Sequence, residues 1–368
     1  MSAHPLARYS AEVAAFSLAG SAGDAPAPPA DEHETRRRAD AILERADAAG
    51  RRDILLFGLG LGALADALAR RPPPGGTLTV LEPDPARYRA LASAGRLLAF
   101  TPDGPARIAT DASPWALLLL AHLHGPGRDA ALVLNPELTG KDRAGAQAVQ
   151  RLVQAAAPLE LTPDAPWPDL HAGAILDPEE PELDAFFAQF PARLAGLHVV
   201  WDAEAAPART PPCPAPTTHA AHPLDTGFAD QRNRMLAGMG GDWGLYLDGD
   251  EELSEALWTA LPALCAADVA GWCLPRRTFL APGRCRVGYG LWPDVQLRLF
   301  RRLPGVRFAR PVHEVLTGLD GPLGLVLDHS ILHYSHLRKA PRTEISAREA
   351  VAAGHQLLRR RPALLLLP

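Results

Sequence analysis

The stretch Gly241-Asp-Trp-Gly-Leu-Tyr-Leu-Asp-Gly-Asp-Glu-Glu252 joins a short apolar segment to an acidic cluster. Residues 245–247 are typical of a buried strand, and the acidic residues follow where that strand would leave its sheet. Asp248 and Asp250 are separated by one glycine, which lets the backbone bend so that both carboxylates can face one divalent cation. The alternative interpretation is an acidic turn that caps the next helix, 254–261, without any ligand.

Composition narrows the class of protein. A chain of 368 residues is longer than one typical core, so we expect two domains. Its hydrophobic content of 47% with 21% charged residues is that of an ordinary globular protein. The net charge of -5 gives no electrostatic reason to expect nucleic acid as a partner. The four cysteines form no C-x-x-C pair, which argues against a zinc ribbon and against a disulfide scaffold.

Targeting signals are not evident in the sequence. The N-terminus lacks a basic region followed by an apolar core, which argues against secretion. Apolar runs such as 116–121 are too short to span a bilayer. We therefore expect no transmembrane segment and a cytoplasmic location.

The N-terminal half contains the segment Asp53-Ile-Leu-Leu-Phe-Gly-Leu-Gly-Leu-Gly62, which predicts a buried strand that turns through alternate glycines into a helix, 63–70. A second strand, 77–81, ends in an acidic residue. Such a unit begins a doubly wound nucleotide-binding sheet, where glycines let a ligand approach the backbone and the acid can hold ribose hydroxyls. The alternative is a tight turn that binds nothing. The candidate ligand-binding residues are Gly58, Gly60, Gly62 and Glu82.

The spacing of these glycines, G-x-G-x-G, departs from the dinucleotide fingerprint G-x-G-x-x-G and disfavours NAD. Residues Phe57–Gly62 and Leu81–Pro85 resemble the first motif of class I methyltransferases and the Rossmann-like domain of motility accessory proteins linked to flagellin glycosylation. The methyltransferase resemblance implies S-adenosylmethionine as a cofactor. Asn135-Pro-Glu137 follows a further strand but lacks the second proline and the aromatic residue of the N-P-P-Y motif, so we interpret it as an ordinary turn.

The second half has the pattern of a β-α-β unit, with strands at 172–176 and 197–201. Asp202 follows the second strand, at the sheet edge where open parallel sheets bind ligands, and is a candidate for contacting a nucleoside. The Pro- and Ala-rich segment 203–222 predicts a loop. The helix predicted next, 227–236, carries two further polar candidates, Arg232 and Asn233.

From about residue 172 to 336 the chain resembles the family 2 glycosyltransferases of the GT-A fold. Several landmarks occur in the order found in that family, which is more specific than any one of them. They are Phe228–Asn233, Gly241–Trp243, Leu247–Glu251, Trp292–Arg301, Val312–Glu314 and His333–Tyr334. The family motif D-x-G-S-T-D is replaced here by Trp201-Asp-Ala-Glu204, so the nucleoside pocket is altered.

The resemblance, which is to bacterial members of the family, implies transfer of a sugar from a nucleotide-sugar donor. We expect that donor to be UDP-linked. The resemblance implies that Asp294 is the base that deprotonates the acceptor hydroxyl. The alternative for Asp294 is a turn acid paired with Arg298. It also implies that Asp248, Asp250 and His313 hold Mn²⁺ or Mg²⁺, which would neutralise the departing diphosphate. The implied donor-binding residues are Asp202, Arg232, Asn233, Asp248, Asp250 and Arg298.

The sequence as a whole therefore predicts an α/β protein. We expect a Rossmann-like doubly wound domain at 31–160, a GT-A nucleotide-sugar-binding domain at 170–340 and a C-terminal helix at 341–368. The favoured function is a metal-dependent glycosyltransferase that acts on a glycan or protein acceptor. Two alternatives stay open: methylation by the N-terminal domain, alone or in a bifunctional chain, and a non-catalytic nucleotide-binding module.

Overall fold

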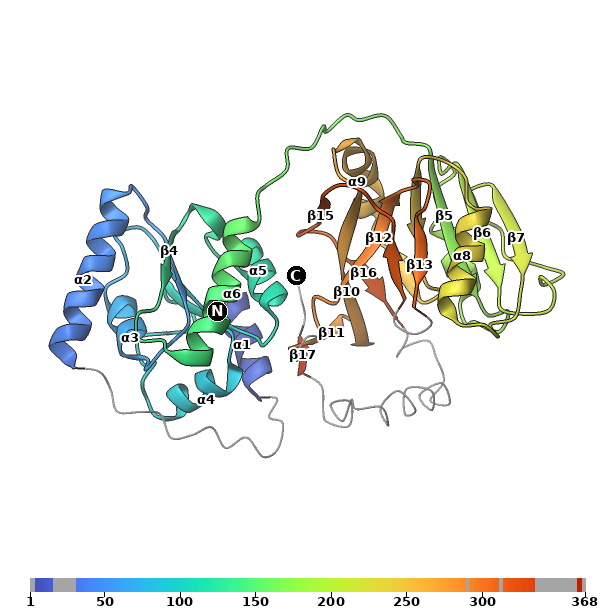
Figure 1. Cartoon of the computed structure of the whole chain (residues 1–368). Coiled ribbons are helices and arrows are strands. Elements are labelled where there is room, and N and C mark those ends of the chain that lie inside the picture. Colours follow the sequence, from blue (N-terminus) through green and yellow to red (C-terminus); the bar gives the residue numbers. More distant parts are fainter. Residues whose placement is uncertain (1–3, 16–30, 289–290, 311–313, 335–362, 366–368) are drawn as a thin grey trace. The chain divides into compact units, whose positions relative to one another are not determined.

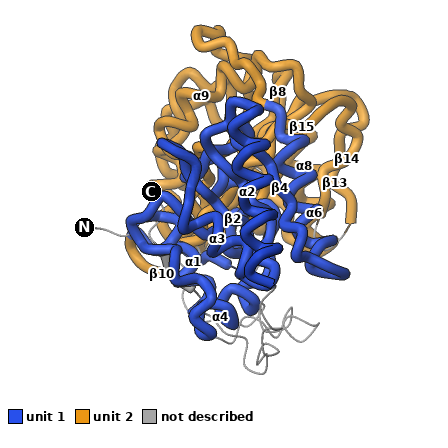
Figure 2. The backbone as a smooth tube through the Cα atoms, turned by 90° about the vertical axis from the view of Figure 1, so that its left-hand side faces the viewer, with its two compact units in different colours: residues 1–157, 283–293, 350–368 blue, residues 158–282, 294–349 orange. Residues whose placement is uncertain are grey.

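The computed structural model describes residues 4–15, 31–288, 291–310, 314–334 and 363–365 (Figure 1). The chain forms two compact units (Figure 2). Unit 1 comprises 1–157, 283–293 and 350–368, and unit 2 comprises 158–282 and 294–349. Both units are built from helices and strands, so the α/β fold class is confirmed. The domain boundaries drawn from the sequence stay a prediction. Of the C-terminal helix expected at 341–368, the structure describes only residues 363–365, which form a strand instead.

Unit 1 contains a parallel sheet in the order β3-β2-β1-β4. Its strands are β1 (Ile54–Phe57), β2 (Leu78–Glu82), β3 (Ala106–Thr110) and β4 (Ala131–Leu134). The chain runs outward from β1 to β3 and then returns to place β4 beside β1. This reversal of strand order is where doubly wound sheets usually bind ligands. The glycine loop that follows β1 lies at that position.

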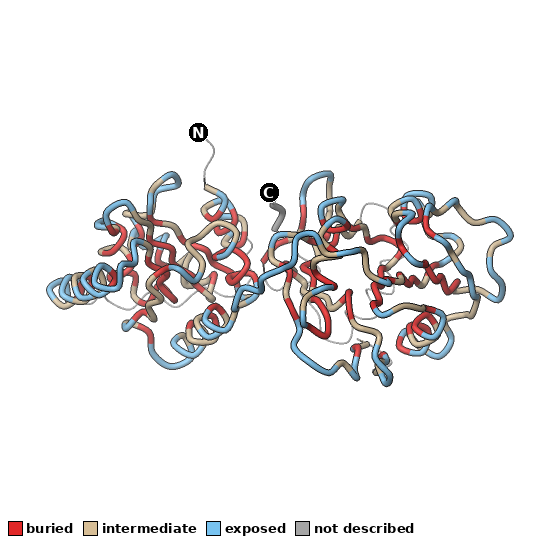
Figure 3. The backbone as a smooth tube through the Cα atoms, turned by 90° about the horizontal axis from the view of Figure 1, so that it is seen from above, coloured by how far each residue is buried: buried red, intermediate tan, exposed pale blue. Residues whose placement is uncertain are grey.

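Helices cover both faces of this sheet, which explains why β1 and β2 are buried throughout. Ile54 and Leu56 belong to a core shared with α2 and α3, whereas α6 contacts β1 and β4, and its neighbour α5 contacts β2 and β3. The helices are α2 (Glu32–Ala48), α3 (Ala63–Arg70), α4 (Pro85–Ser93), α5 (Pro114–His124) and α6 (Gly140–Ala155). Figure 3 shows buried stretches in the interior of each unit and exposed stretches around them.

One helix of unit 1, α1 (Pro5–Ala15), was not predicted from the sequence. It packs on β3, where the Ser10 hydroxyl donates to the carbonyl of Ile108 over 2.7 Å and the Tyr9 hydroxyl donates to Asp111 over 2.6 Å. Two short strands, β11 (Arg284–Val287) and β17 (Ala363–Leu365), pair antiparallel and also belong to unit 1.

Unit 2 contains a larger mixed sheet in the order β10-β12-β8-β5-β6-β7. Strands β5 to β8 run parallel, and β12 runs antiparallel to both of its neighbours. The strands are β5 (Leu170–Leu176), β6 (Gly196–Trp201), β7 (Thr217–Ala221), β8 (Trp243–Tyr246), β10 (Gly271–Ala281) and β12 (Val295–Arg301). The prediction of a continuous loop at 203–222 is wrong, because its polar end forms β7 beside β6.

Two apolar clusters hold the helices of unit 2 against its strands. One contains Phe186, Trp201 and Trp258, and the other contains Met235, Tyr246 and further residues of α8 and β12. The helices are α7 (Leu183–Ala188), α8 (Phe228–Gly238) and α9 (Glu255–Ala266). The remaining short strands are β9 (Glu251–Leu253), β13 (Arg307–Ala309), β14 (Val315–Thr317), β15 (Leu323–Leu325) and β16 (Ile331–His333).

The strand directions in unit 2 bring polar residues to one edge of its sheet. Asp202 follows β6 and Asp248 follows β8, and both strands end at the carboxyl edge. Because β12 is antiparallel, its beginning at Asp294 and Val295 reaches the same edge. Pro275 of β10 pairs with Val295, so Arg276 lies there as well. Among the described residues, no helix combines the length and apolarity needed to cross a bilayer.

Candidate functional site

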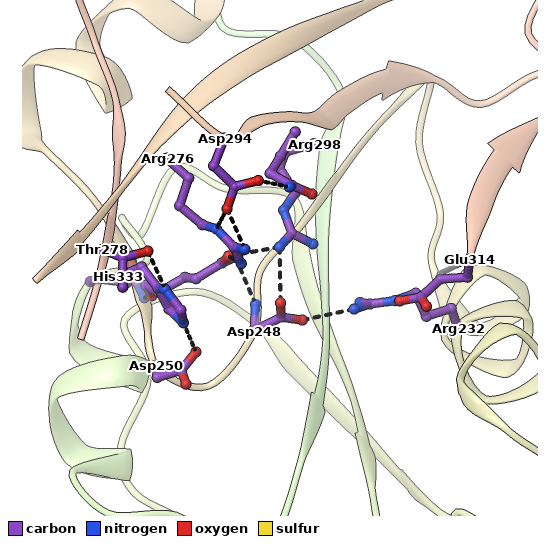
Figure 4. Close-up of polar contacts among 12 residues, drawn as sticks. Arg232, Asp248, Asp250, Arg276, Thr278, Asp294, Arg298, Glu314 and His333 are labelled. Atoms are coloured by element: carbon purple, nitrogen blue, oxygen red, sulfur yellow. Dashed lines mark hydrogen bonds and ion pairs between the residues drawn. The ribbon is translucent and has the colours of Figure 1, made fainter. Parts of the chain in front are cut away.

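Acidic and basic side chains alternate at this edge of unit 2 (Figure 4). They come from the turn after β8, from β9, from β10, from β12 and the residue before it, from α8 and from the segment that precedes β14. We call the set the charge cluster. Its members are Arg232, Asp248, Glu251, Arg276, Asp294, Arg298 and Glu314.

Asp248 lies at the centre of the charge cluster and has both carboxylate oxygens engaged. Arg232 donates to its Oδ1 over 3.0 Å, and Arg298 donates to its Oδ2 over 2.9 Å. Burial alone would raise the pKa of Asp248, but the guanidinium groups of Arg298 and Arg232 hold it well below its usual range. Asp248 is therefore a carboxylate that two arginines neutralise.

Arg298 is almost fully buried and links two carboxylates. Its Nη2 donates to Glu251 over 2.7 Å as well as to Asp248. Burial acts to lower the pKa of Arg298, but Asp248 and Glu251 raise it well above its usual range. The ring of Tyr246 lies 4.4 Å from the guanidinium carbon of Arg298 and 4.8 Å from that of Arg232. The aromatic face thus helps to hold two like charges near one carboxylate.

Asp294, the predicted base, is held by Arg276. Nε and Nη2 of Arg276 donate to Oδ2 of Asp294 over 2.8 and 2.6 Å, and Gln296 donates to Oδ1 over 2.7 Å. The alternative interpretation named Arg298 as the partner, which is wrong in this structure, since Arg298 turns to Asp248 and Glu251. Arg276 also donates to Glu251 over 3.0 Å, so Asp294 is coupled to the rest of the charge cluster.

Asp250 points to a different set of partners. Its Oδ1 lies 3.4 Å from Nε2 of His333, and Nδ1 of His333 lies 2.9 Å from the Thr278 hydroxyl. Figure 4 shows Asp250 directed toward His333, while Asp248 is directed toward the arginines. The pairing of β9 with β16 places His333 there, opposite Glu251.

A divalent cation shared by Asp248 and Asp250 does not fit this arrangement, because the two carboxylates bind separate partners. In the part of the chain that the structure describes, no group of three or more His, Cys, Asp or Glu residues could hold a metal ion. His313, the third predicted ligand, lies outside the described residues. The metal site stays a prediction, and loading it would require Asp248 to exchange arginine contacts for the ion.

Two other predicted donor-binding residues have structural partners. Asp202 accepts a hydrogen bond from the amide of Leu224 over 2.6 Å. The Asn233 side chain donates to the carbonyl of Phe308 over 2.9 Å and accepts from its amide over 2.8 Å, which fastens α8 to β13. The structure therefore brings Arg232, Asp248, Arg298 and Asp294 together, and places Asp202 and Asn233 in separate contacts.

Sequence reasoning did not single out Arg276, although it connects Asp294 to Glu251. Its position depends on the register of β10 against β12, which no local pattern encodes. Two buried donor atoms also stand out: within the described residues, Nη1 of Arg232 and Nε of Arg298 have no hydrogen-bond partner. Buried donors without partners are costly, and an anion that accepts from them would remove that cost.

The predicted N-terminal site lies in unit 1. Gly58, Gly60 and Gly62 all have positive φ angles, of 86°, 60° and 86°, which form the tight turn between β1 and α3. Glu82 is buried and accepts from the amides of Leu59 and Asp84 over 2.7 and 2.8 Å. Burial raises its pKa to about 7. Its carboxylate is thus engaged by the loop itself.

Comparison with known proteins gives no family assignment, since no family model matches the chain. A TPR repeat-containing protein from Synechococcus elongatus is 38% identical over 99 residues, which are 25% of this chain and 23% of that protein. The chain thus matches less than a quarter of that relative, and nothing about the whole relative carries over.

Two solved structures resemble part of the chain at low similarity. TarS 1–349 from S. aureus in complex with UDP-GlcNAc is 10% identical with a TM-score of 0.33, over 52% of this chain and 68% of that one. HddC from Yersinia pseudotuberculosis is 7% identical with a TM-score of 0.27, over 49% of this chain and 99% of that one. Such weak similarity carries no argument about function, which has to come from the site.

Proposed function

We propose that unit 2 is a glycosyltransferase that moves a sugar from a nucleotide-sugar donor, UDP-linked by expectation, to a glycan or protein hydroxyl. The observation that carries the proposal is the charge cluster at the carboxyl edge of the sheet, where parallel α/β sheets bind ligands. Residues far apart in the sequence converge there, and they include the Arg298 and Asp294 expected from the resemblance to family 2.

The cluster supplies groups for each part of such a transfer. Arg232 and Arg298 can donate to the leaving diphosphate, since each has a buried nitrogen without a partner in the described residues. Asp294 takes the proton of the acceptor hydroxyl in the proposal, and Arg276 orients its carboxylate. Dependence on Mn²⁺ or Mg²⁺ is a separate part of the proposal, because the described carboxylates do not form a shared ion site.

A non-catalytic nucleotide-binding module is the second candidate, and a specific observation favours it. Both oxygens of Asp248 are already paired with arginines, as in a purely structural ion network. Methylation with S-adenosylmethionine by unit 1 is the third hypothesis. The engagement of Glu82 by Leu59 and Asp84 does not support it, since the ribose acid is already occupied.

The test uses the full chain and a panel of nucleotide-sugars, with release of the nucleoside diphosphate as the readout. Asp294→Asn should reduce turnover by roughly 10²–10⁴-fold while donor-induced thermal stabilisation persists. Asp320→Asn, at an exposed position, is the matched control and should behave like the wild type. Repeating the assay with EDTA and then with Mn²⁺ tests the metal.

The outcomes separate the candidates. Stabilisation by a nucleotide-sugar without turnover would favour the binding module over the enzyme. If no donor shifts the melting temperature and no turnover occurs, the glycosyltransferase proposal fails. If EDTA leaves the activity unchanged, the transferase proposal stands and its metal dependence is rejected.

A further inference from the structure

The turn Asn135-Pro-Glu137 follows β4 and lies beside the glycine loop of unit 1. Because β4 pairs with β1 in parallel, the two strands end at the same edge. The buried Asn135 side chain donates to the carbonyl of Gly58 over 3.0 Å and accepts from the amide of Glu137 over 2.9 Å. These two hydrogen bonds fix the turn against the loop and direct Glu137.

The carboxylate of Glu137 is bound by the loop and by the helix that follows it. Oε2 accepts from the amide of Leu61 over 2.9 Å, and Oε1 accepts from the amide of Leu64 over 3.1 Å. Leu64 belongs to the first turn of α3, where amides have no partner within the helix. In nucleotide-binding sheets these amides receive the anionic group of a ligand.

The glycine in the middle of the loop makes room for this contact. A Cβ atom added at Gly60 would lie 2.7 Å from both Cβ and Oε2 of Glu137 and 2.9 Å from Nδ2 of Asn135. The close approach that Gly60 permits is therefore that of the chain's own side chains. The amide of Leu59 is engaged too, since it donates to Glu82.

We propose that Glu137 is an internal substitute for the anionic group of a ligand, so that the glycine loop of unit 1 is filled by its own chain. The amides at 59, 61 and 64 all donate to carboxylates of unit 1. Unit 1 accordingly does not bind S-adenosylmethionine or a nucleotide through this loop in the wild-type chain, and removing the Glu137 carboxylate creates an anion-binding site. This inference is independent of the function proposed for unit 2.

The experiment measures the melting temperature of the full chain for the wild type, Glu137→Ala and Glu137→Gln. Glu44→Ala, at an exposed position of α2, is the matched control. Each protein is titrated with sodium acetate against sodium chloride at equal ionic strength, and separately with S-adenosylmethionine. No nucleotide-sugar is present, so the result does not depend on turnover by unit 2.

Glu137→Ala is expected to melt about 4–8 °C lower, because two amides lose a charged acceptor. Acetate should restore part of that loss and chloride should not, while the wild type and Glu44→Ala do not respond to acetate. Glu137→Gln, which keeps one acceptor oxygen and the side-chain volume, should lose less stability and respond less. This variant also keeps the test valid if Glu137→Ala does not fold.

Three results would overturn the inference. The first is saturable stabilisation of the wild type by S-adenosylmethionine. The second is a melting temperature of both variants equal to that of the wild type. The third is a loss of stability that acetate and chloride affect equally, which would assign Glu137 a packing role only.

Discussion

The two units stabilise buried carboxylates with different kinds of partner. Each places carboxylates at the carboxyl edge of parallel strands, where they are partly or fully removed from water. In unit 1, Glu82 and Glu137 are bound by backbone amides. In unit 2, Asp248 is bound by two arginines. Neutral amides only partly offset the cost of removing a carboxylate from water, so its pKa rises. Guanidinium groups stabilise the carboxylate by more than that cost, so its pKa falls.

This difference gives the units opposite responses to pH. Burial raises the pKa of Glu82 to about 7 and that of Asp111 to about 6, so the folded unit 1 holds protons that the unfolded chain has released. The stability of unit 1 therefore falls as pH rises from the ordinary pKa values of these groups, 4.5 and 3.8, to their folded-state values. The pKa of Asp248 is depressed, so its contribution is present above the unfolded value and is lost as pH falls through the folded value.

The largest effect is expected for Arg298→Leu. It removes the buried arginine that Asp248 and Glu251 share, which should lower the free energy of unfolding of unit 2 by about 3–5 kcal/mol. Urea denaturation at neutral pH measures the change. Arg307→Leu, at an exposed position of β13, serves as the control and should change stability by less than about 0.5 kcal/mol. Equal effects of the two changes would mean that Arg298 stabilises unit 2 no more than an exposed arginine does.

A slightly smaller effect is expected for unit 1 from pH alone. The pKa of Glu82 rises from 4.5 to about 7 on folding, through burial. Unit 1 should therefore lose about 3 kcal/mol of stability from Glu82 as pH increases over that interval. Urea denaturation at a series of pH values checks this, and Glu82→Gln should flatten the slope whatever its effect on absolute stability. A slope that the variant leaves unchanged would contradict the assignment to Glu82.

The smallest effect is expected for Asp248→Asn. The amide retains the shape but loses the charge, so the contacts with Arg232 and Arg298 weaken and stability at neutral pH should fall by about 1.5–3 kcal/mol. The difference from the wild type should shrink as pH falls below about 4, because the unfolded chain then binds a proton at Asp248 while the folded state, with its depressed pKa, still holds the carboxylate. Acid titrations of both proteins, followed by circular dichroism, measure the convergence. A difference that stays constant down to acid pH would exclude Asp248 as the titrating group.

Local patterns predicted what is local in this molecule. The apolar run before Gly58 predicted β1, and the apolar segment before Asp248 predicted β8, because strands buried on both faces have nearly uniform composition. The partners of the charged residues were not predictable in the same way. Asp294 contacts Arg276 because β10 and β12 pair in one register, and that register depends on the whole sheet.

Contacts across long stretches of sequence also explain what was missed in unit 1. The acidic residue Glu82 was recognised from its place at the end of a predicted strand, but it was expected to face a ligand. The structure turns it toward the amide of Leu59, and Glu137 from the turn after β4 fills the rest of the loop. A carboxylate that follows a strand has the same sequence pattern whether its partner is a ligand or the chain itself.

The composition of strand β7 has a consequence for aggregation. Among the described strands it is the last on its side of the sheet in unit 2, and its five residues, Thr217–Ala221, are largely exposed. Its short, polar sequence explains why it was predicted as a loop. The same features make it a sheet edge that resists pairing with other chains. An outermost strand with unused backbone groups invites other chains to add to it, and brevity with hydrophilic side chains discourages such aggregation.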